Sequence, residues 1–305
     1  MTPRLVVLRA LGLGDFLTAV PALRALAAAF PAHRRILLAP AWLEPLAALL
    51  DGAVHRILDV EGRAAVPTAV PPQAHGADVA VNLHGRGPQS TALVWGTRPG
   101  RLVSFGVPGG PAWRDGEHEV ARWCRLLEES GIPADPRALD LDAPPGFDRH
   151  GATILHPGAA APARRWPADR WAAVARAERA TGRPVVVSAG PGEETEALSV
   201  AATAGLPADT VRSGGNLEDL ARLVAGAGRV ACADTGVAHL ATALRVPSVV
   251  LFGPTPPAEW GPPPDRGRHR VLWAGRRGDP NGPAPDPGLL EIEPAAVTAE
   301  LAALA

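Results

Sequence analysis

The chain has 305 residues, with 30 Lys+Arg against 31 Asp+Glu and a formal net charge of −1. Because soluble domains usually have roughly 100–200 residues, this length predicts two domains, each able to bury a core of its own. The balanced charge argues against a nucleic-acid partner, whose phosphates require a clustered basic surface. No apolar run reaches about 18 residues, so we expect no transmembrane segment and at most a peripheral contact with a membrane.

The start of the chain and its cysteines indicate a cytoplasmic protein. Arg9 interrupts the first short apolar run, and no cleavage pattern of small residues follows, so this segment is typical of a strand and not of a secretory signal. Cys124 and Cys232 each lie among apolar residues, which excludes a disulfide framework and a zinc cluster. The sequence has no lysine, so every cationic role must fall to arginine or histidine.

Short β-rich segments alternate with amphipathic ones along most of the chain, which is typical of a parallel α/β fold. The first half predicts strands at 5–8, 36–39, 79–82 and 102–104, and helices at 16–29 and 117–130. A polar segment with prolines, 140–148, predicts a linker. The second half predicts strands at 153–156, 185–188, 230–233, 248–252 and 269–273, and helices at 168–181, 193–204, 217–225, 237–244 and 294–303.

Two similar halves joined by one linker predict two Rossmann-like domains, residues 1–147 and 148–305, that face each other across a cleft. Ligands of such sheets bind beyond the carboxyl ends of the strands. The loops that follow strands are therefore the candidate sites.

The loop after the first predicted strand contains a Gly-x-Gly turn, Gly12 and Gly14, followed by Asp15. It supports two interpretations. Either the glycines allow a tight turn and Asp15 caps the next helix, or the loop binds a ligand. As a dinucleotide fingerprint it is incomplete, because Leu17 occupies the position of the third glycine.

Two loops of the second half carry groups that suit a nucleotide. Small residues around Gly158 would expose backbone N–H groups, and Arg164 and Arg165 follow, whose planar guanidinium suits phosphate. The alternative is that both arginines are solvated surface charge. Glu193 and Glu194 begin a predicted helix, where a carboxylate either complements the helix dipole or accepts ribose hydroxyls.

The segment Asp234, Thr235, Gly236 to His239 is the most informative of the four loops. It joins a buried strand to a helix, so the backbone N–H groups of Thr235 and Gly236 form a potential anion site. Asp234 and His239 need polar partners beside an apolar helix, although His239 could also be a satisfied core histidine. The Asp-x-Asp pattern at 140–142 matches a metal motif, but it lies in the predicted linker, away from the nucleotide loops, and we interpret it as solvated charge.

Taken together, these loops resemble the ADP-heptose glycosyltransferases of glycosyltransferase family 9, which include the lipopolysaccharide heptosyltransferases. The most specific block is Asp234 to Leu240, followed by Pro247 and by Phe-Gly-Pro-Thr at 252–255. Supporting blocks are 11–15 with 21–23, and 156–159 with 164–167. The resemblance spans nearly the whole chain and implies a GT-B fold, with an N-terminal acceptor domain and a C-terminal donor domain. It also implies that the closing helix, 294–303, packs back on the N-terminal domain.

The resemblance further implies an inverting, metal-independent transfer of a sugar, heptose from ADP-heptose, to a hydroxyl of a glycan, lipid-linked or small-molecule acceptor, without a cofactor. Asp15 occupies the place of the general base. Arg164, where the family usually has lysine, would hold the donor phosphates with the backbone of Thr235 and Gly236. The remaining implied positions are the loop glycines Gly12, Gly14 and Gly158, Glu194 or its neighbour Glu193 for the ribose, Asp234 and His239 for the sugar, and His84 and Arg86 on the acceptor side.

Two other functions fit parts of the sequence. A nicotinamide-dependent oxidoreductase would use Gly12 and Gly14 as its dinucleotide turn, but it lacks the third glycine and an acidic residue after a clear second strand. A catalytically silent nucleotide-sugar-binding protein would keep the same fold, and the presence of Asp15 argues against it.

Overall fold

The computed structural model describes residues 2–61 and 66–304, and the chain divides into two compact units, Met1–Leu139 and Asp140–Ala305. The sequence placed the junction after residue 147, within the proline-bearing segment. In the structure, the first linker residues already belong to the second unit by their contacts. The Leu141 N–H donates to the Ala243 carbonyl at 2.8 Å, and Asp140 forms an ion pair with Arg266.

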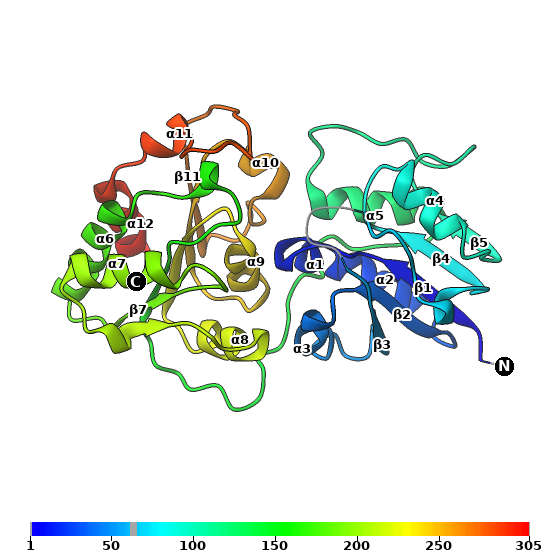
Figure 1. The fold of residues 1–305 in the computed structure, drawn as a ribbon, viewed down its shortest axis with the longest axis horizontal. Helices are drawn as coiled ribbons and strands as arrows, with labels where there is room; N and C mark the ends of the chain where they lie inside the picture. The colour runs from blue at the N-terminus through cyan, green and yellow to red at the C-terminus, as the bar shows by residue number, and fades with distance from the viewer. Residues whose placement is uncertain (1, 62–65, 305) are drawn as a thin grey trace. The chain divides into compact units, whose positions relative to one another are not determined.

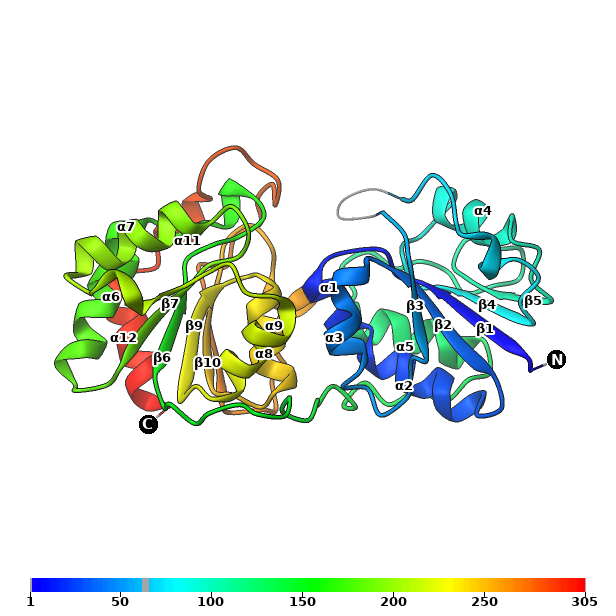
Figure 2. The same ribbon diagram turned by 60° about the horizontal axis from the view of Figure 1, so that its bottom comes forward.

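The first unit is a parallel five-stranded sheet in the order β3-β2-β1-β4-β5 (Figure 1). Its strands are β1 (Arg4–Leu8), β2 (Arg34–Ala39), β3 (Arg56–Asp59), β4 (Val79–Asn82) and β5 (Arg101–Val103). Its α-helices are α1 (Leu13–Thr18), α2 (Val20–Ala29), α3 (Glu44–Ala47), α4 (Gln89–Trp95) and α5 (Glu119–Glu129). Helix α4 covers one face of this sheet, and α2 and α5 cover the other (Figure 2).

The helix predicted at 16–29 is in fact two helices, α1 and α2, with Ala19 between them. Proline lacks the backbone N–H that a continuous helix would need, and Pro21 therefore lies in the first turn of α2, where such a donor is not required. The break leaves α1 as a short helix that directly follows β1 and carries Asp15.

The second unit is a parallel six-stranded sheet in the order β11-β10-β9-β6-β7-β8. Its strands are β6 (Thr153–His156), β7 (Val185–Ser188), β8 (Val211–Arg212), β9 (Arg229–Ala233), β10 (Ser248–Phe252) and β11 (His269–Trp273). Its α-helices are α6 (Ala168–Ala180), α7 (Glu194–Ala204), α8 (Leu217–Ala225), α9 (Gly236–Ala243), α10 (Pro257–Trp260), α11 (Pro287–Leu290) and α12 (Pro294–Ala303). Every strand predicted in this half is present.

In both sheets the strand that comes first along the chain lies in the interior of the sheet. The first strand of each unit, β1 or β6, has the next two strands on one side and a later strand, β4 or β9, on the other. The chain thus changes direction across the sheet between β1 and β4, and again between β6 and β9. Ligands of open α/β sheets bind at such switch points, outside the carboxyl ends of the strands.

The closing helix α12 packs within the second unit, against α6 and the sheet. Its side chains Val297 and Leu301 are fully buried in the same core as Trp166 and Trp171. These apolar side chains of the closing helix therefore belong to the core of its own unit.

A buried ion pair joins three elements of this core. Arg229 of β9 lies 2.6 Å from Glu178 of α6, and both side chains are less than 5% exposed. The Arg229 guanidinium also donates to the Leu301 carbonyl of α12. Because burying two charges costs several kcal/mol, such a pair is stable only while both partners remain.

We expect Arg229→Leu to lower the free energy of unfolding of the second unit by about 3–5 kcal/mol, because it leaves the Glu178 carboxylate buried without its partner. The double variant Arg229→Leu/Glu178→Leu should recover much of this loss. Urea unfolding followed by tryptophan fluorescence measures both. As a control, Arg270→Leu breaks an exposed pair with Glu300 of α12 and should cost less than about 1 kcal/mol. A double variant no more stable than Arg229→Leu would contradict this explanation.

Candidate active site

The structure brings together the two phosphate-binding segments predicted in the second unit. Strands β6 and β9 are parallel neighbours, so the loops that follow them lie at the same edge of the sheet. Arg164 ends a short 3-10 helix, Pro162–Arg164, in the first of these loops. Its Nη1 donates to the Asp234 carbonyl oxygen in the second, at 3.3 Å.

Arg164 retains unused hydrogen-bonding capacity at this switch point. Its side chain is half-buried, and its Nε is buried without a hydrogen-bond partner among the described residues. A buried donor next to a full positive charge is costly to leave unsatisfied, by about 1–3 kcal/mol or more. An anion bound at this point would supply the missing acceptor.

The start of α9 adds a second anion-binding element. Thr235 is the N-cap residue, with an extended backbone and no side-chain hydrogen bond to the helix, so the first backbone N–H groups lack a capping side chain. Asp234 is buried just before it. His239 is half-buried rather than a core residue, and its ring meets the edge of Trp260 at a centroid distance of 6.0 Å.

The two glutamates at the start of α7 differ in orientation. The Glu193 carboxylate turns back over its own loop, where it accepts the Gly190 N–H at 2.8 Å. It also fills the space beside Gly158, where an added Cβ would lie 2.1 Å from it. Glu194 makes no hydrogen bond or ion pair to any residue that the structure describes.

His156, the last residue of β6, connects Glu193 to the sheet. Its Nδ1 lies 3.0 Å from the Ser188 hydroxyl, and its Nε2 lies 3.5 Å from the Glu193 carboxylate. Burial lowers the pKa of His156, and the negative charge of Glu193 opposes this effect. This arrangement cannot be predicted from the sequence, because His156 and Ser188 are separated by 32 residues and meet only through the β6–β7 pairing.

Arg165 stabilises the loop that follows β6. Its Nε donates to the Ala159 carbonyl at 2.9 Å, and its Nη1 lies 3.7 Å from Glu196. Burial raises the pKa of Glu196. Of the two neighbouring arginines, Arg165 thus holds the loop in shape, whereas Arg164 faces the β6–β9 switch point.

In the first unit, Asp15 is the third residue of α1, and Gly12 is the N-cap residue. The Asp15 Oδ2 accepts the Gly12 N–H at 3.3 Å, and Oδ1 lies 3.3 Å from Nη2 of Arg9. The Asp15 side chain is 28% exposed. Its pKa is raised, chiefly because burial disfavours the charge; Arg9 opposes this shift, and Glu119 adds to it.

Neither glycine of the Gly12-x-Gly14 turn is required by backbone strain. Gly12 has φ −76° and ψ −178°, which any residue can adopt, and Gly14 lies inside α1. A Cβ at Gly12 would make only an ordinary contact, 3.5 Å from the Asp15 carboxylate. Backbone strain therefore does not explain the glycine at position 12.

The loop after β4 lies beside the Asp15 loop, because β1 and β4 are neighbouring strands. His84 accepts the Ala10 N–H through Nδ1 at 3.2 Å. Burial, with Arg9 nearby, lowers the pKa of His84 to about 4, so the ring is neutral and carries its proton on Nε2. Arg86 is exposed and makes no hydrogen bond or ion pair within the described part of the chain.

Other features of the chain do not form a site. Asp140 and Asp142 form ion pairs with Arg245, so the Asp-x-Asp pattern is paired linker charge. Among the described residues, no group of three His, Cys, Asp or Glu side chains is placed to hold a metal ion. None of the described helices is long and apolar enough to span a membrane.

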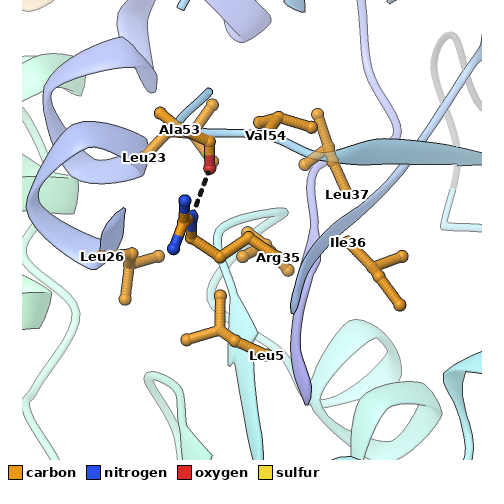
Figure 3. Close-up of a pocket in the computed structure, with 9 residues that line it drawn as sticks. Leu5, Leu23, Leu26, Arg35, Ile36, Leu37, Ala53 and Val54 are labelled. Atoms are coloured by element: carbon orange, nitrogen blue, oxygen red, sulfur yellow. Dashed lines mark hydrogen bonds between the residues drawn. The ribbon is translucent and has the colours of Figure 1, made fainter. Parts of the chain in front are cut away.

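A small apolar pocket in the first unit also lies away from the predicted loops (Figure 3). It is closed by Arg35, near the start of β2, which donates to the carbonyls of Phe30, Gly52 and Ala53 at 2.9–3.2 Å. The amino end of a parallel strand is the edge opposite to the switch point. This pocket is therefore part of the packing of the unit. Its lining residues are Leu5, Val7, Leu23, Leu26, Arg35, Ile36, Leu37, Ala53 and Val54.

Comparison with known proteins identifies relatives with the same two-unit architecture. The solved structure of E. coli ADP-heptose LPS heptosyltransferase II superposes with a TM-score of 0.77 at 21% identity, over 99% of this chain and 98% of that chain. A glycosyltransferase family 9 structure from Veillonella parvula gives a TM-score of 0.80 at 20% identity, over 99% and 97%. These similarities show that the fold is of the GT-B type.

Sequence comparison agrees with the structural one. Lipopolysaccharide heptosyltransferase 1 of Pseudomonas aeruginosa is 32% identical over 164 residues, which are 49% of this chain and 43% of that protein. The match thus spans less than half the length of this curated relative. The family model described as glycosyltransferase family 9 (heptosyltransferase) matches residues 111–278, more than half of the chain. The chain therefore belongs to glycosyltransferase family 9.

Proposed function

We propose that this protein is a glycosyltransferase that moves a sugar from an ADP-sugar, with ADP-heptose as the first candidate, to a hydroxyl group of an acceptor. The observation that carries the proposal is Arg164, whose buried Nε lacks a partner beside the uncapped start of α9. A guanidinium and a helix N-terminus together form a strong site for a diphosphate. The name of the E. coli relative, an ADP-heptose LPS heptosyltransferase, supports ADP-heptose as the donor.

Within this proposal the two units have separate tasks. The second unit binds the donor through Arg164 and the backbone of Thr235 and Gly236, with Asp234 and His239 beside the sugar. As the nucleoside diphosphate leaves, negative charge grows on its phosphates, and these groups stabilise that charge. We assign the ribose to Glu193 instead of Glu194, because its carboxylate turns over the Gly158 loop.

The first unit would bind the acceptor and supply the base. A sugar hydroxyl is a poor nucleophile, and a carboxylate that takes its proton in the transition state contributes about 10²–10⁴-fold. Asp15 is suited to this role because it is partly exposed and its pKa is raised, which makes it a stronger base than an ordinary aspartate. Direct attack by the activated hydroxyl on the donor carbon inverts the configuration of that carbon.

The loop after β4 carries two groups suited to binding the acceptor. The curated relative acts on lipopolysaccharide by its name, which favours a glycan or lipid-linked acceptor. His84 offers its Nε2 proton to such an acceptor, and the exposed Arg86 suits a negatively charged group near it. Both cysteines are free and buried, which supports a cytoplasmic site of action.

Asp15→Asn is the sharpest test of the base, because it keeps the shape and the hydrogen bond from the Gly12 N–H but removes the proton acceptor. Turnover should fall by about 10²–10⁴-fold, while donor affinity and melting temperature remain near those of the wild type. Initial transfer rates, calorimetry with ADP and thermal unfolding measure the three quantities. Asp15→Ala, which also removes the hydrogen bond, should cost about 1 kcal/mol of stability in addition. Near-normal transfer by Asp15→Asn would leave Asp15 a structural residue.

Arg164→Ala should weaken ADP binding by roughly 1.5–3 kcal/mol, the value of hydrogen bonds to a charged group. Arg183, which precedes β7 at the opposite edge of the same sheet, provides the matched control, and Arg183→Ala should leave the affinity unchanged. In the same titrations, Glu193→Gln should weaken ADP binding and Glu194→Gln should not. Unchanged affinity in Arg164→Ala would refute the assignment of the diphosphate site, and the reverse order of the two glutamates would return the ribose to Glu194.

The proposed reaction needs no metal ion, because Arg164 and the start of α9 neutralise the leaving group. Transfer by protein treated with EDTA and then freed of chelator should remain within about twofold of the untreated rate, since removing a spectator ion leaves the barrier unchanged. Loss of activity that is restored by added magnesium, manganese or iron would show that a metal takes part.

A further inference from the structure

Arg9, which directly follows β1, is a buried arginine that contacts both the backbone and the carboxylate of Asp15. It is 1% exposed, and its Nε donates to the Asp15 carbonyl oxygen at 2.9 Å. Its Nη1 donates to the Leu83 carbonyl at 2.6 Å. Its Nη2 lies 3.3 Å from the Asp15 carboxylate, 3.2 Å from the Thr18 hydroxyl and 3.0 Å from Glu119. Burying an arginine is costly unless its donors are paired, and each of the three guanidinium nitrogens of Arg9 has an acceptor.

Glu119, the first residue of α5, is the second carboxylate on this arginine. It is 5% exposed, and its Oε1 accepts from both Arg9 and the Trp123 indole, the latter at 2.8 Å. Its Oε2 forms an ion pair with Arg122. The Trp123 ring also lies under the Arg9 guanidinium, 4.8 Å from ring centroid to Cζ. Glu119 is thus held in one position, with its charge shared between two arginines.

Arg9 therefore binds the two carboxylates unequally. Its contact with Glu119 is the shorter one, and the Asp15 carboxylate receives a single long contact in place of a bidentate pair. A bidentate arginine–carboxylate pair would stabilise the ionised form strongly and make Asp15 a weak base. Arg9 contacts the Asp15 backbone carbonyl more closely, at 2.9 Å, than the Asp15 carboxylate, at 3.3 Å. The position of Asp15 is therefore fixed without full neutralisation of its carboxylate.

We propose that Arg9 is the positioning residue of the catalytic carboxylate, and that Glu119 keeps Asp15 basic by occupying the other side of Arg9. This inference rests on the proposed function of Asp15 as the general base. A base is most effective when its pKa is close to the working pH. Sharing one arginine between two carboxylates raises the basicity of the exposed one while its geometry stays fixed.

The charged and titratable groups around Asp15 come from three elements. Arg9 directly follows β1, Glu119 and Arg122 lie on α5, and His84 follows β4. His84 is neutral above a pH of about 4, so it adds no charge in the working range. Arg9 lowers the pKa of Asp15 more than Glu119 raises it. Removing the Glu119 charge alone should therefore lower the pKa of Asp15, whereas removing the charges of both Arg9 and Glu119 should raise it.

Two variants test the proposal through the acid limb of the pH profile of kcat/KM. Glu119→Gln frees Arg9 to bind Asp15 alone, so the limb should move to lower pH by about 0.5–1 unit, and the plateau rate should fall because the base is weaker. Arg9→Gln/Glu119→Gln removes the buried Arg9–Glu119 pair as a whole, while Arg122 keeps its contact with Glu117 at 3.9 Å. Its limb should move to higher pH than in the wild type, with a lower kcat because the Asp15 backbone has lost its anchor.

The control is Glu128→Gln, which removes an exposed carboxylate from the same helix α5 and should leave the profile unchanged. A merely structural role for Arg9 and Glu119 would lower melting temperatures without these opposite shifts. If the double variant does not fold, Glu119→Gln decides alone: no shift, or a shift to higher pH, would overturn the proposal.

A measurement without turnover separates this proposal from the proposed function. The Asp15 carboxyl can be titrated by ¹³C NMR and identified by the signal that disappears in Asp15→Asn. The same two opposite shifts are expected in the free protein. If they occur while Asp15→Asn transfers sugar normally, the role as base fails and the positioning network stands. If the Asp15 titration is the same in the wild type and Glu119→Gln, the network proposal fails whatever the reaction is.

Discussion

The position of the first strand in the middle of each sheet is the constraint on which the candidate site depends. Because β1 and β6 are central, the chain must cross to the other side of the sheet before it adds β4 or β9. The loops that follow the two central strands lead to helices on opposite faces of the sheet. Each unit therefore has one place between these loops where backbone N–H groups and polar side chains meet. Arg164 meets Asp234 at one such place, and His84 meets the Asp15 loop at the other.

Much of this arrangement could be predicted from the sequence, because it is encoded in short apolar segments. Strand β10 is buried on both faces, so four of its five residues form an uninterrupted apolar run, 249–252. Strand β3 was missed, since two of its four residues are exposed, and helices α3 and α4 were missed because they are only one or two turns long. The break at Ala19 was missed because a proline such as Pro21 can kink a continuous helix or lie in the first turn of a new one, and the sequence does not distinguish the two.

The candidate site was predicted by residue type but not by orientation. Arg164 and Asp234 could be singled out because each follows a strand, and the structure joins them. The choice between Glu193 and Glu194 depends on the direction in which each side chain points at the start of α7. The spacing of residues in the sequence does not determine that direction. The sequence shows Arg9 only as a charge in an apolar run, because its partner Glu119 lies 110 residues further on. Long-range ion pairs leave no local pattern.

The contact between Glu193 and Gly158 couples the side-chain volumes allowed at two distant positions of the chain. The Glu193 carboxylate occupies the volume that any side chain at position 158 would need. A homologue with alanine or serine at 158 must therefore shorten or redirect residue 193, and one that loses the glutamate releases the constraint on the glycine. Sequence variation at these two positions should be correlated, although 35 residues separate them along the chain.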